Sequence, residues 1–258
     1  MKKDIDIAIE AVKKASHFIM SVYIDEDLKI EYKDKDQPVT IADRGSHDIL
    51  LDILSKSKYP IISEESPKED KDKINTYDKF WLIDPLDGTK EFIKRNDEFA
   101  ILVSLIENNE SILGVMYFPT SDTLYYSEKD TKAFKISKSG VKSVLKMNNP
   151  KNDVIFLTSK SNISDSDKIY KFLEDKEYNF IEKSYGASLK YAKMLENEGD
   201  IYFRYSSKMS QWDIAAPHCI IKSAGGEVVT LETREEFRYG DQKMTIPSFI
   251  IKHKNFKI

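Results

Sequence analysis

The chain of 258 residues is long enough for one large domain or for two modest domains that share an interface. Its 40 Lys and Arg residues nearly balance 44 Asp and Glu residues, and the net charge of −4 argues against a general nucleic-acid-binding protein. No stretch approaches the roughly 20 apolar residues of a membrane span, and the charged N-terminus has no apolar signal core. The single cysteine, Cys219, excludes an intrachain disulfide and is typical of a buried structural thiol in a reducing compartment. We therefore expect a cytoplasmic protein and leave open a peripheral contact with the inner face of the cell membrane.

The first part of the chain alternates helical and extended patterns. Apolar residues at helical spacing predict a helix over residues 4–23, with Asp4 as its N-cap. The charged segment 31–38 is typical of a loop. A second helix is expected from P-V-T-I-A-D to about residue 56, because Thr40 followed by Asp43 fits a capping box. Residues 59–64 predict a short strand that ends at acids, residues 67–78 a polar loop, and residues 79–84 a buried strand.

From residue 99 onward, short β-rich runs separated by turn residues predict an antiparallel meander. The segment at residues 146–153 is the best candidate for a domain boundary. Beyond it, strands at 154–159, 178–183, 201–206, 227–232 and 248–253 alternate with helices near 165–176, 187–198 and 213–224. This alternation is typical of an α/β unit. We therefore predict an N-terminal α+β half at residues 1–150 and a C-terminal α/β half at residues 151–258.

The string W-L-I-D-P-L-D-G-T at positions 81–89 places two acids, Asp84 and Asp87, in one tight turn. Like charges held close together repel and raise each other's pKa, unless a cation lies between them. Mg²⁺ prefers oxygen ligands and binds through a few carboxylates and a substrate phosphate, and the Leu86 carbonyl offers a further oxygen. Gly88 has no side chain, so its N–H can approach an anion, and Thr89 adds a hydroxyl. The string therefore predicts a metal and phosphate site in preference to an ordinary Asp-Gly turn.

Other acids stand at the ends of predicted elements. Glu64 and Glu65 end a strand, Asp213 begins a helix, and Asp43 lies in the capping box. For Glu64 and Asp213 taken alone, a solvated acidic edge and an N-cap are the favoured readings, and for Asp43 the cap and a functional role are even. Only their combination with the 81–89 string indicates one site.

The series P-V-T-I-A-D, S-E-E, W-L-I-D-P-L-D-G-T and W-D-I-A-A resembles the Li⁺-sensitive, Mg²⁺-dependent phosphatases of the inositol monophosphatase superfamily. The segments K-E-F-I-K-R-N (90–96), L-G-V-M-Y-F-P (113–119) and G-A-S-L-K (186–190) are similar to the bacterial 3′(2′),5′-bisphosphate nucleotidase branch. Inositol monophosphatases usually continue D-G-T with T-N-F instead. The resemblance implies a sugar-phosphatase-like α/β/α/β/α sandwich with the site between the two halves. Pro217 departs from the family pattern and is expected in the first turn of its helix, where proline is tolerated.

Carried over by motif, the resemblance implies two or three Mg²⁺ ions per site. Glu64 and Asp84, together with the Leu86 carbonyl, would hold one ion. Asp84, Asp87 and Asp213 would hold a second.

The resemblance also implies roles for residues around the metals. Asp43 and Thr89 would orient and activate the attacking water, and the Gly88 and Thr89 amides would bind the scissile phosphate. Lys190 and Arg204 match basic positions that could grip a second phosphate. The metal-binding residues that would also contact the substrate are Glu64, Leu86, Asp87 and Asp213.

The implied activity is hydrolysis of a phosphate monoester by metal-activated water, converting 3′-phosphoadenosine 5′-phosphate to AMP and phosphate, a recycling step of sulfate assimilation. An inositol or other sugar monophosphatase on the same scaffold is the alternative, because fold alone does not separate the two. A non-catalytic, metal-dependent nucleotide sensor is a third reading, although none of the implied ligands is missing. The implied partner is a small nucleotide bisphosphate, without nucleic acid, and the chain would be a monomer or a homodimer.

Overall fold

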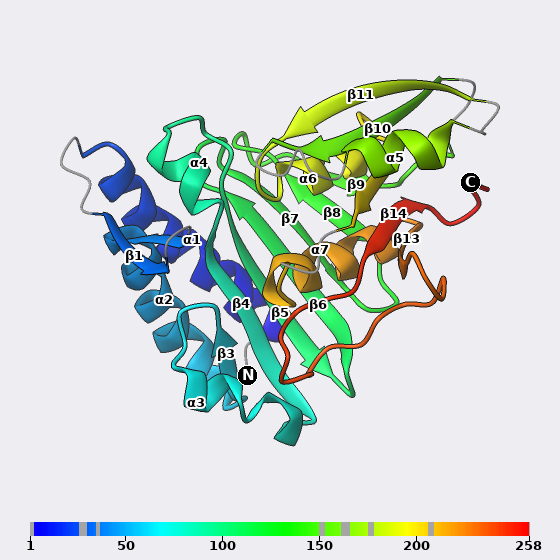
Figure 1. Cartoon of the computed structure of the whole chain (residues 1–258). Helices are drawn as coiled ribbons and strands as arrows, with labels where there is room; N and C mark the ends of the chain where they lie inside the picture. The colour runs from blue at the N-terminus through cyan, green and yellow to red at the C-terminus, as the bar shows by residue number, and fades with distance from the viewer. Residues whose placement is uncertain are drawn as a thin grey trace.

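The computed structural model describes residues 3–25, 30–34, 37–149, 153–160, 166–174, 178–205 and 209–257. Within these ranges the strands form a two-stranded hairpin, a seven-stranded sheet and a five-stranded sheet. Helices cover and separate the two large sheets, which gives the five layers α/β/α/β/α that the resemblance implies (Figure 1). None of the helices in these ranges combines the length and the apolar character needed to cross a membrane.

The outer helical layer consists of α1 (Asp4–Tyr23) and α2 (Ile41–Leu54), which a 3-10 turn at Ser55–Ser57 follows. The two helices bury a common apolar cluster against one face of the seven-stranded sheet. The predicted capping box is present at the start of α2: the Thr40 N–H donates to Asp43 Oδ2 at 2.7 Å, and the Thr40 hydroxyl accepts from the Ala42 N–H at 3.1 Å. The cap fixes Asp43 in place, which matters for the site described below.

Residues 31–34 and 37–38, the described part of the segment 31–38, do not form the predicted loop. They contribute to a hairpin in which β1 (Ile30–Asp34) pairs antiparallel with β2 (Gln37–Thr40), with Ile30 opposite Thr40. The prediction was wrong because it followed the many charged residues of this segment, whereas Ile30, Tyr32 and Val39 are residues that favour strands.

The seven-stranded sheet begins with the parallel pair β3 (Ile61–Ser63) and β4 (Lys79–Asp87). The connection between them, predicted as a loop, contains the short helix α3 (Lys68–Lys71) and a 3-10 turn at Ile74–Thr76. After β4 and the short helix α4 (Thr89–Ile93), the chain forms the predicted antiparallel meander. Its strands are β5 (Ala100–Glu107), β6 (Glu110–Phe118), β7 (Thr123–Glu128), β8 (Ala133–Ile136) and β9 (Lys142–Leu145).

The five-stranded sheet has the order β11-β10-β12-β14-β13. Its strands are β10 (Asp153–Ser159), β11 (Asn179–Tyr185), β12 (Ile201–Arg204), β13 (Gly226–Thr230) and β14 (Phe249–His253). Helices α5 (Ser166–Leu173), α6 (Leu189–Leu195) and α7 (Trp212–Ser223) alternate with these strands as predicted. The division into halves at residue 150 concerns folding units and stays a prediction.

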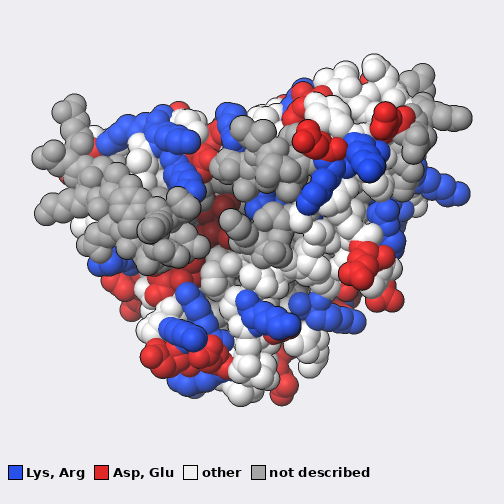
Figure 2. Space-filling model, in the orientation of Figure 1, with Lys and Arg blue, Asp and Glu red and all other residues white. Residues whose placement is uncertain are grey.

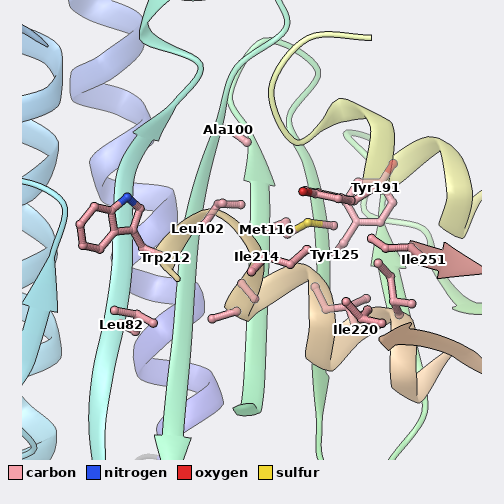
Figure 3. Packing of buried hydrophobic residues seen from close by; sticks show 14 of the residues in the cluster. Leu82, Ala100, Leu102, Met116, Tyr125, Tyr191, Trp212, Ile214, Ile220 and Ile251 are labelled. Atoms are coloured by element: carbon pink, nitrogen blue, oxygen red, sulfur yellow. The ribbon is translucent and has the colours of Figure 1, made fainter. Parts of the chain in front are cut away.

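Helix α7 lies between the two large sheets and contacts both. Figure 3 shows Leu102 and Met116 of the seven-stranded sheet facing the side of the cluster that holds Ile214 and Ile220 of α7. Pro217 lies in the interior of α7, not in its first turn as predicted. Because proline has no N–H, the helix lacks the bond that would otherwise reach the carbonyl of residue 213.

The contact between α7 and β6 leaves no room for a side chain at Gly114. A Cβ atom there would lie 2.3 Å from the Ala216 carbonyl oxygen, which is backbone and cannot rotate away. The glycine therefore sets the distance between the sheet and α7.

We expect Gly114→Ala to lower the free energy of unfolding by about 3 kcal/mol, because the added methyl group forces α7 away from β6. The control is Gly140→Ala: Gly140 has a φ of 78° and no neighbour within 4 Å of an added Cβ. That variant should lose only about 1 kcal/mol from backbone strain. Urea unfolding of the three proteins checks this, and a loss for Gly114→Ala no larger than the loss for the control would contradict it.

Candidate functional site

The acid pair of the 81–89 string is carried by β4, which continues through both acids and does not end at Asp84 as predicted. Asp84 lies opposite Leu102, whereas Asp87 lies opposite Ala100, so three steps along β4 match two steps along β5. Such an irregularity bends a strand and re-aims its side chains. It allows two nearby acids of one strand to approach a common point.

Asp213 joins this pair from α7. Its Oδ2 accepts a hydrogen bond from the Ser210 N–H at 2.8 Å, which orients the carboxylate at the start of the helix. Asp84, Asp87 and Asp213 each offer one carboxylate oxygen, and these three atoms lie within 4.8 Å of one another. In Figure 2, acidic atoms occupy a recess near the middle of the face, where Figure 1 places the carboxyl end of β4. The structure thus brings together three acids from two distant parts of the sequence.

Burial, together with repulsion from neighbouring carboxylates, raises the pKa values of Asp84 and Asp213. Burial raises the pKa of Asp84 well above its usual range, and the charges of Glu64, Asp87 and Asp213 raise it further. Burial, followed by the charges of Asp87 and Glu64, raises the pKa of Asp213 to about 8. Glu64 follows β3, and its N–H donates to the Ile83 carbonyl on β4 at 3.2 Å. The predicted fourth acid therefore lies beside the other three, and a bound cation would relieve the repulsion.

The Asp87 carboxylate has two different sides. On one side, the Ser188 hydroxyl and N–H donate hydrogen bonds to the carboxylate. Burial raises the pKa of Asp87, and the Lys190 charge and the two Ser188 hydrogen bonds oppose this rise. The other oxygen, Oδ2, is buried and has no hydrogen-bond partner among the described residues. A buried carboxylate oxygen without a donor, next to two further carboxylates, fits a hard divalent cation.

Asp43 and Thr89 form a pair beside the acids. The Thr89 hydroxyl donates to Asp43 Oδ1 at 2.9 Å, while Asp43 Oδ2 accepts from the Thr40 N–H and hydroxyl. The Thr89 hydroxyl also lies 3.3 Å from the carbonyl oxygen of Leu86. The two predicted roles of Asp43, as a helix cap and as a functional residue, are thus compatible, because one of its oxygens caps α2 and the other faces Thr89.

Gly88 connects β4 to α4 in a left-handed conformation, with a φ of 97°. A Cβ atom at this position would lie 2.6 Å from the Cβ of Ala187 and 3.0 Å from the carbonyl oxygen of Glu98. Glycine is required here both by the backbone conformation and by the close approach of the segment that carries Lys190.

Lys190 and Arg204, predicted as second-phosphate residues against the alternative of solvated surface charges, are both buried, with 4% and 6% of their surface exposed. The Lys190 ammonium donates to the Ala187 carbonyl and lies over the rings of Tyr191 and Tyr202. Burial lowers the pKa of Lys190 to about 8, the Asp87 charge opposes this, and the Arg204 charge adds to it. The two cations therefore lie close to each other and to the acids.

Sequence reasoning missed two residues that contact the site. Ser188, which bonds Asp87, stands in the quoted G-A-S-L-K segment, and its place two residues before Lys190 could have signalled it. Lys71 donates to the Glu64 carbonyl and lies over the Trp212 ring at 5.0 Å from its centroid. Lys71 belongs to a run of charged residues in which no sequence pattern distinguishes it.

A separate cavity of about 410 Å³ lies along the C-terminal half of α7, where His218, Cys219 and Lys222 contribute to its lining. The three cations at its rim, Lys129, Lys222 and Arg238, are already paired. Glu110 binds both Lys129 and Arg238, at 2.7 and 2.6 Å, and Lys222 binds Glu236 at 2.7 Å. Its rim cations are thus neutralised, in contrast to the acids at the carboxyl end of β4.

The sequence model of the Inositol monophosphatase family matches residues 1–257. The chain is similar to the 3′(2′),5′-bisphosphate nucleotidase CysQ of Buchnera aphidicola subsp. Acyrthosiphon pisum, with 35% identity over 232 residues, which cover 89% of this chain and 85% of that protein. It is 30% identical to the protein of the same name from Escherichia coli strain K12, with 87% of this chain and 89% of that protein covered.

Solved structures agree with these similarities. CysQ from Bacteroides thetaiotaomicron, a bacterial member of the inositol monophosphatase family, has a TM-score of 0.84 and 32% identity, with 96% of each chain covered. An IMPase from Thermotoga maritima has a TM-score of 0.77 and 25% identity, with 96% of this chain and 91% of that chain covered. The layered fold expected from the sequence is thereby confirmed.

We expect a divalent cation such as Mg²⁺ to stabilise the wild-type protein by about 2–3 kcal/mol at a concentration of about 100 times its Kd. Asp87→Asn should lose most of this gain, while its metal-free stability should be unchanged or higher because one repelling charge is gone. Thermal unfolding with Mg²⁺ and with excess EDTA measures both quantities.

The matched control is Asp70→Asn, since Asp70 is an exposed carboxylate that pairs with Lys73 outside the cluster. It should respond to Mg²⁺ like the wild type. A full Mg²⁺ response in Asp87→Asn would show that the acids at the end of β4 do not hold the cation.

Proposed function

The chain belongs to the inositol monophosphatase family, and we propose that it is a metal-dependent 3′(2′),5′-bisphosphate nucleotidase that converts 3′-phosphoadenosine 5′-phosphate to AMP and phosphate. The observation that carries the proposal is the similarity of nearly the whole chain to bisphosphate nucleotidases, at 30–35% identity. The group Asp84, Asp87 and Asp213 supports it, because the acids that such a reaction needs are close together in this chain.

We assign Mg²⁺ to these acids, as two or three ions. Asp84, Asp87 and Asp213 would hold one ion, and Glu64 and Asp84 with the Leu86 carbonyl would hold another. Bound there, Mg²⁺ would lower the pKa of the attacking water and neutralise charge on the leaving oxygen. The donor set supports this assignment, since it consists of oxygens alone and Asp87 Oδ2 has no other partner among the described residues.

Asp43 and Thr89 would position the attacking water. With its proton donated to Asp43 Oδ1 at 2.9 Å, the Thr89 oxygen keeps its lone pairs for a hydrogen bond from a water. Asp43 is itself held by Thr40, so the pair is ordered before substrate arrives. The Gly88 and Thr89 amides would bind the oxygens of the scissile phosphate, where the glycine allows a close approach.

The second phosphate of the substrate would meet Lys190 and Arg204. Lys190 and Arg204 are buried and their charges repel each other, so a further anion beside them would stabilise the pair. A substrate with two separated phosphates fits both requirements, one phosphate at the acids with their metal and one at this basic pair. A monophosphate would leave the basic pair unused, which favours the nucleotidase over an inositol or other sugar monophosphatase.

We expect Mg²⁺-dependent phosphate release from 3′-phosphoadenosine 5′-phosphate with a kcat/KM at least about tenfold above that for inositol 1-phosphate, because the monophosphate lacks one charge-assisted phosphate contact and such a contact is worth that much. Steady-state kinetics on this panel decides the substrate class. Equal efficiency on inositol 1-phosphate would favour the sugar monophosphatase, and tight nucleotide binding without turnover would favour the sensor.

Lys190→Met tests the basic pair while it keeps an apolar side chain against Tyr191 and Tyr202. We expect its kcat/KM for the bisphosphate to fall about tenfold to hundredfold, with a smaller loss on inositol 1-phosphate, because only the bisphosphate places an anion there. Lys193→Met is the control, since Lys193 lies on the same helix but pairs with Glu196 and Glu198. Equal losses on both substrates would show that Lys190 supports Asp87 and not the second phosphate.

A further inference from the structure

The turn at residues 186–190, which joins β11 to α6 and includes the first two residues of that helix, packs directly against the end of β4 and the glycine that follows it. Ser188 in this turn hydrogen-bonds to Asp87, and the Cβ of Ala187 comes within 2.6 Å of where a Cβ on Gly88 would lie. Ala187 has a φ of 43°, a conformation that residues other than glycine seldom adopt. The placement of this turn therefore decides where Lys190 and one face of Asp87 lie relative to each other.

Glu98, in the connection between α4 and β5, also contacts the 186–190 turn. Its Oε2 accepts a hydrogen bond from the Gly186 N–H at 2.8 Å, and its Oε1 pairs with the Lys160 ammonium at 2.6 Å. Only 13% of the Glu98 side chain is exposed. The Lys160 N–H in turn donates to the Tyr185 carbonyl at 3.2 Å, so one carboxylate ties together the ends of β10 and β11.

These contacts form a closed chain of interactions that begins and ends at Asp87. Asp87 pairs with Ala100 across β4 and β5, and Glu98 lies two residues before Ala100. Glu98 binds Gly186, and Ser188, two residues further along, returns to Asp87. The links from Glu98 to Gly186 and from Ser188 to Asp87 join segments that are far apart in the sequence. Of these side chains, that of Glu98 lies outside the reaction centre.

Gly186 is part of the same arrangement. A Cβ atom at this position would lie 2.7 Å from Glu98 Oε2 and 2.7 Å from Glu91 Cγ. The absence of a side chain thus lets the Glu98 carboxylate reach the backbone N–H of the turn.

We propose that Glu98 is a positioning residue that fixes the 186–190 turn against the acids and thereby sets the spacing between the reaction centre and the site for the second phosphate. The inference rests on the proposed function, because the spacing matters only for a substrate that carries two separated phosphates. Glu98 itself touches neither the metal-binding carboxylates nor the basic pair in any described contact.

The kinetic test compares Glu98→Ala, Glu98→Gln and the wild type. Glu98→Ala should raise the KM for 3′-phosphoadenosine 5′-phosphate about tenfold or more, the effect of losing one charge-assisted hydrogen bond, and should lower kcat by less. Glu98→Gln keeps an oxygen that can accept from the Gly186 N–H, and its KM should stay within about threefold of the wild type. Gly186→Ala, which displaces the carboxylate without removing it, should show the same KM change as Glu98→Ala and provides the test if Glu98→Ala does not fold.

The control variant is Glu107→Ala, since Glu107 lies at the far end of β5 and pairs with Lys79 at 3.0 Å. It should leave KM and kcat unchanged. The inference is overturned if Glu98→Ala keeps the wild-type KM, or if Glu98→Gln loses as much as Glu98→Ala, because the accepted hydrogen bond would then not be the cause.

Hydrogen exchange on the full-length protein without substrate separates this inference from the proposed function. Amides of residues 186–190 should exchange faster in Glu98→Ala and in Gly186→Ala, but not in Glu98→Gln or Glu107→Ala. Unchanged exchange in Glu98→Ala would overturn the positioning role whatever the activity. If the wild type does not hydrolyse the bisphosphate, the proposed function fails, and the claim about phosphate spacing fails with it. Faster exchange of the 186–190 amides in Glu98→Ala would still show that Glu98 holds this turn in place.

Discussion

Electrostatic repulsion among Asp84, Asp87 and Asp213 is the constraint on which the rest of this structure depends. Their oxygens lie within 4.8 Å of one another in a largely buried place, and burial raises the pKa of each acid. Without a compensating charge such a group opposes folding, because the charged forms are both desolvated and mutually repelled. The nearby Lys190 offsets only part of the negative charge. A bound cation would therefore explain why the three acids lie together.

The fold resists this repulsion with contacts between distant segments. The irregular pairing of β4 with β5 aims Asp84 and Asp87 at one point, and the Ser210 N–H orients Asp213 at the start of α7. Helix α7 is itself wedged between two sheets, where Gly114 allows the backbone to approach closely. The same logic extends to the 186–190 turn, which reaches Asp87 through Ser188 while Glu98 holds it in place. Rigid positioning of this kind is what a reaction governed by electrostatic stabilisation requires.

Features with a local cause could be predicted from the sequence, and features with a tertiary cause could not. The Thr40–Asp43 cap, the meander from residue 99 and the helix after Trp212 follow from neighbouring residues, and the motifs identified the acids that converge. The strand irregularity after Asp84 could not be seen, because it depends on register with β5. Two further features arise only when the segments of the five-stranded sheet pack against those of the seven-stranded sheet. They are the burial of Lys190 and Arg204 and the contact between Glu98 and Gly186. Charged residues are mostly exposed, so residue type alone does not predict that both cations are buried.

The most direct test of the central claim is to locate the cation itself. Crystals grown with Mn²⁺ in place of Mg²⁺ give an anomalous signal that marks the metal without reference to activity. We predict a peak within coordination distance of carboxylate oxygens from Asp84, Asp87 and Asp213, and a second peak on the side of Glu64. A map with no peak at these acids, or with peaks only at other acidic residues, would contradict the account.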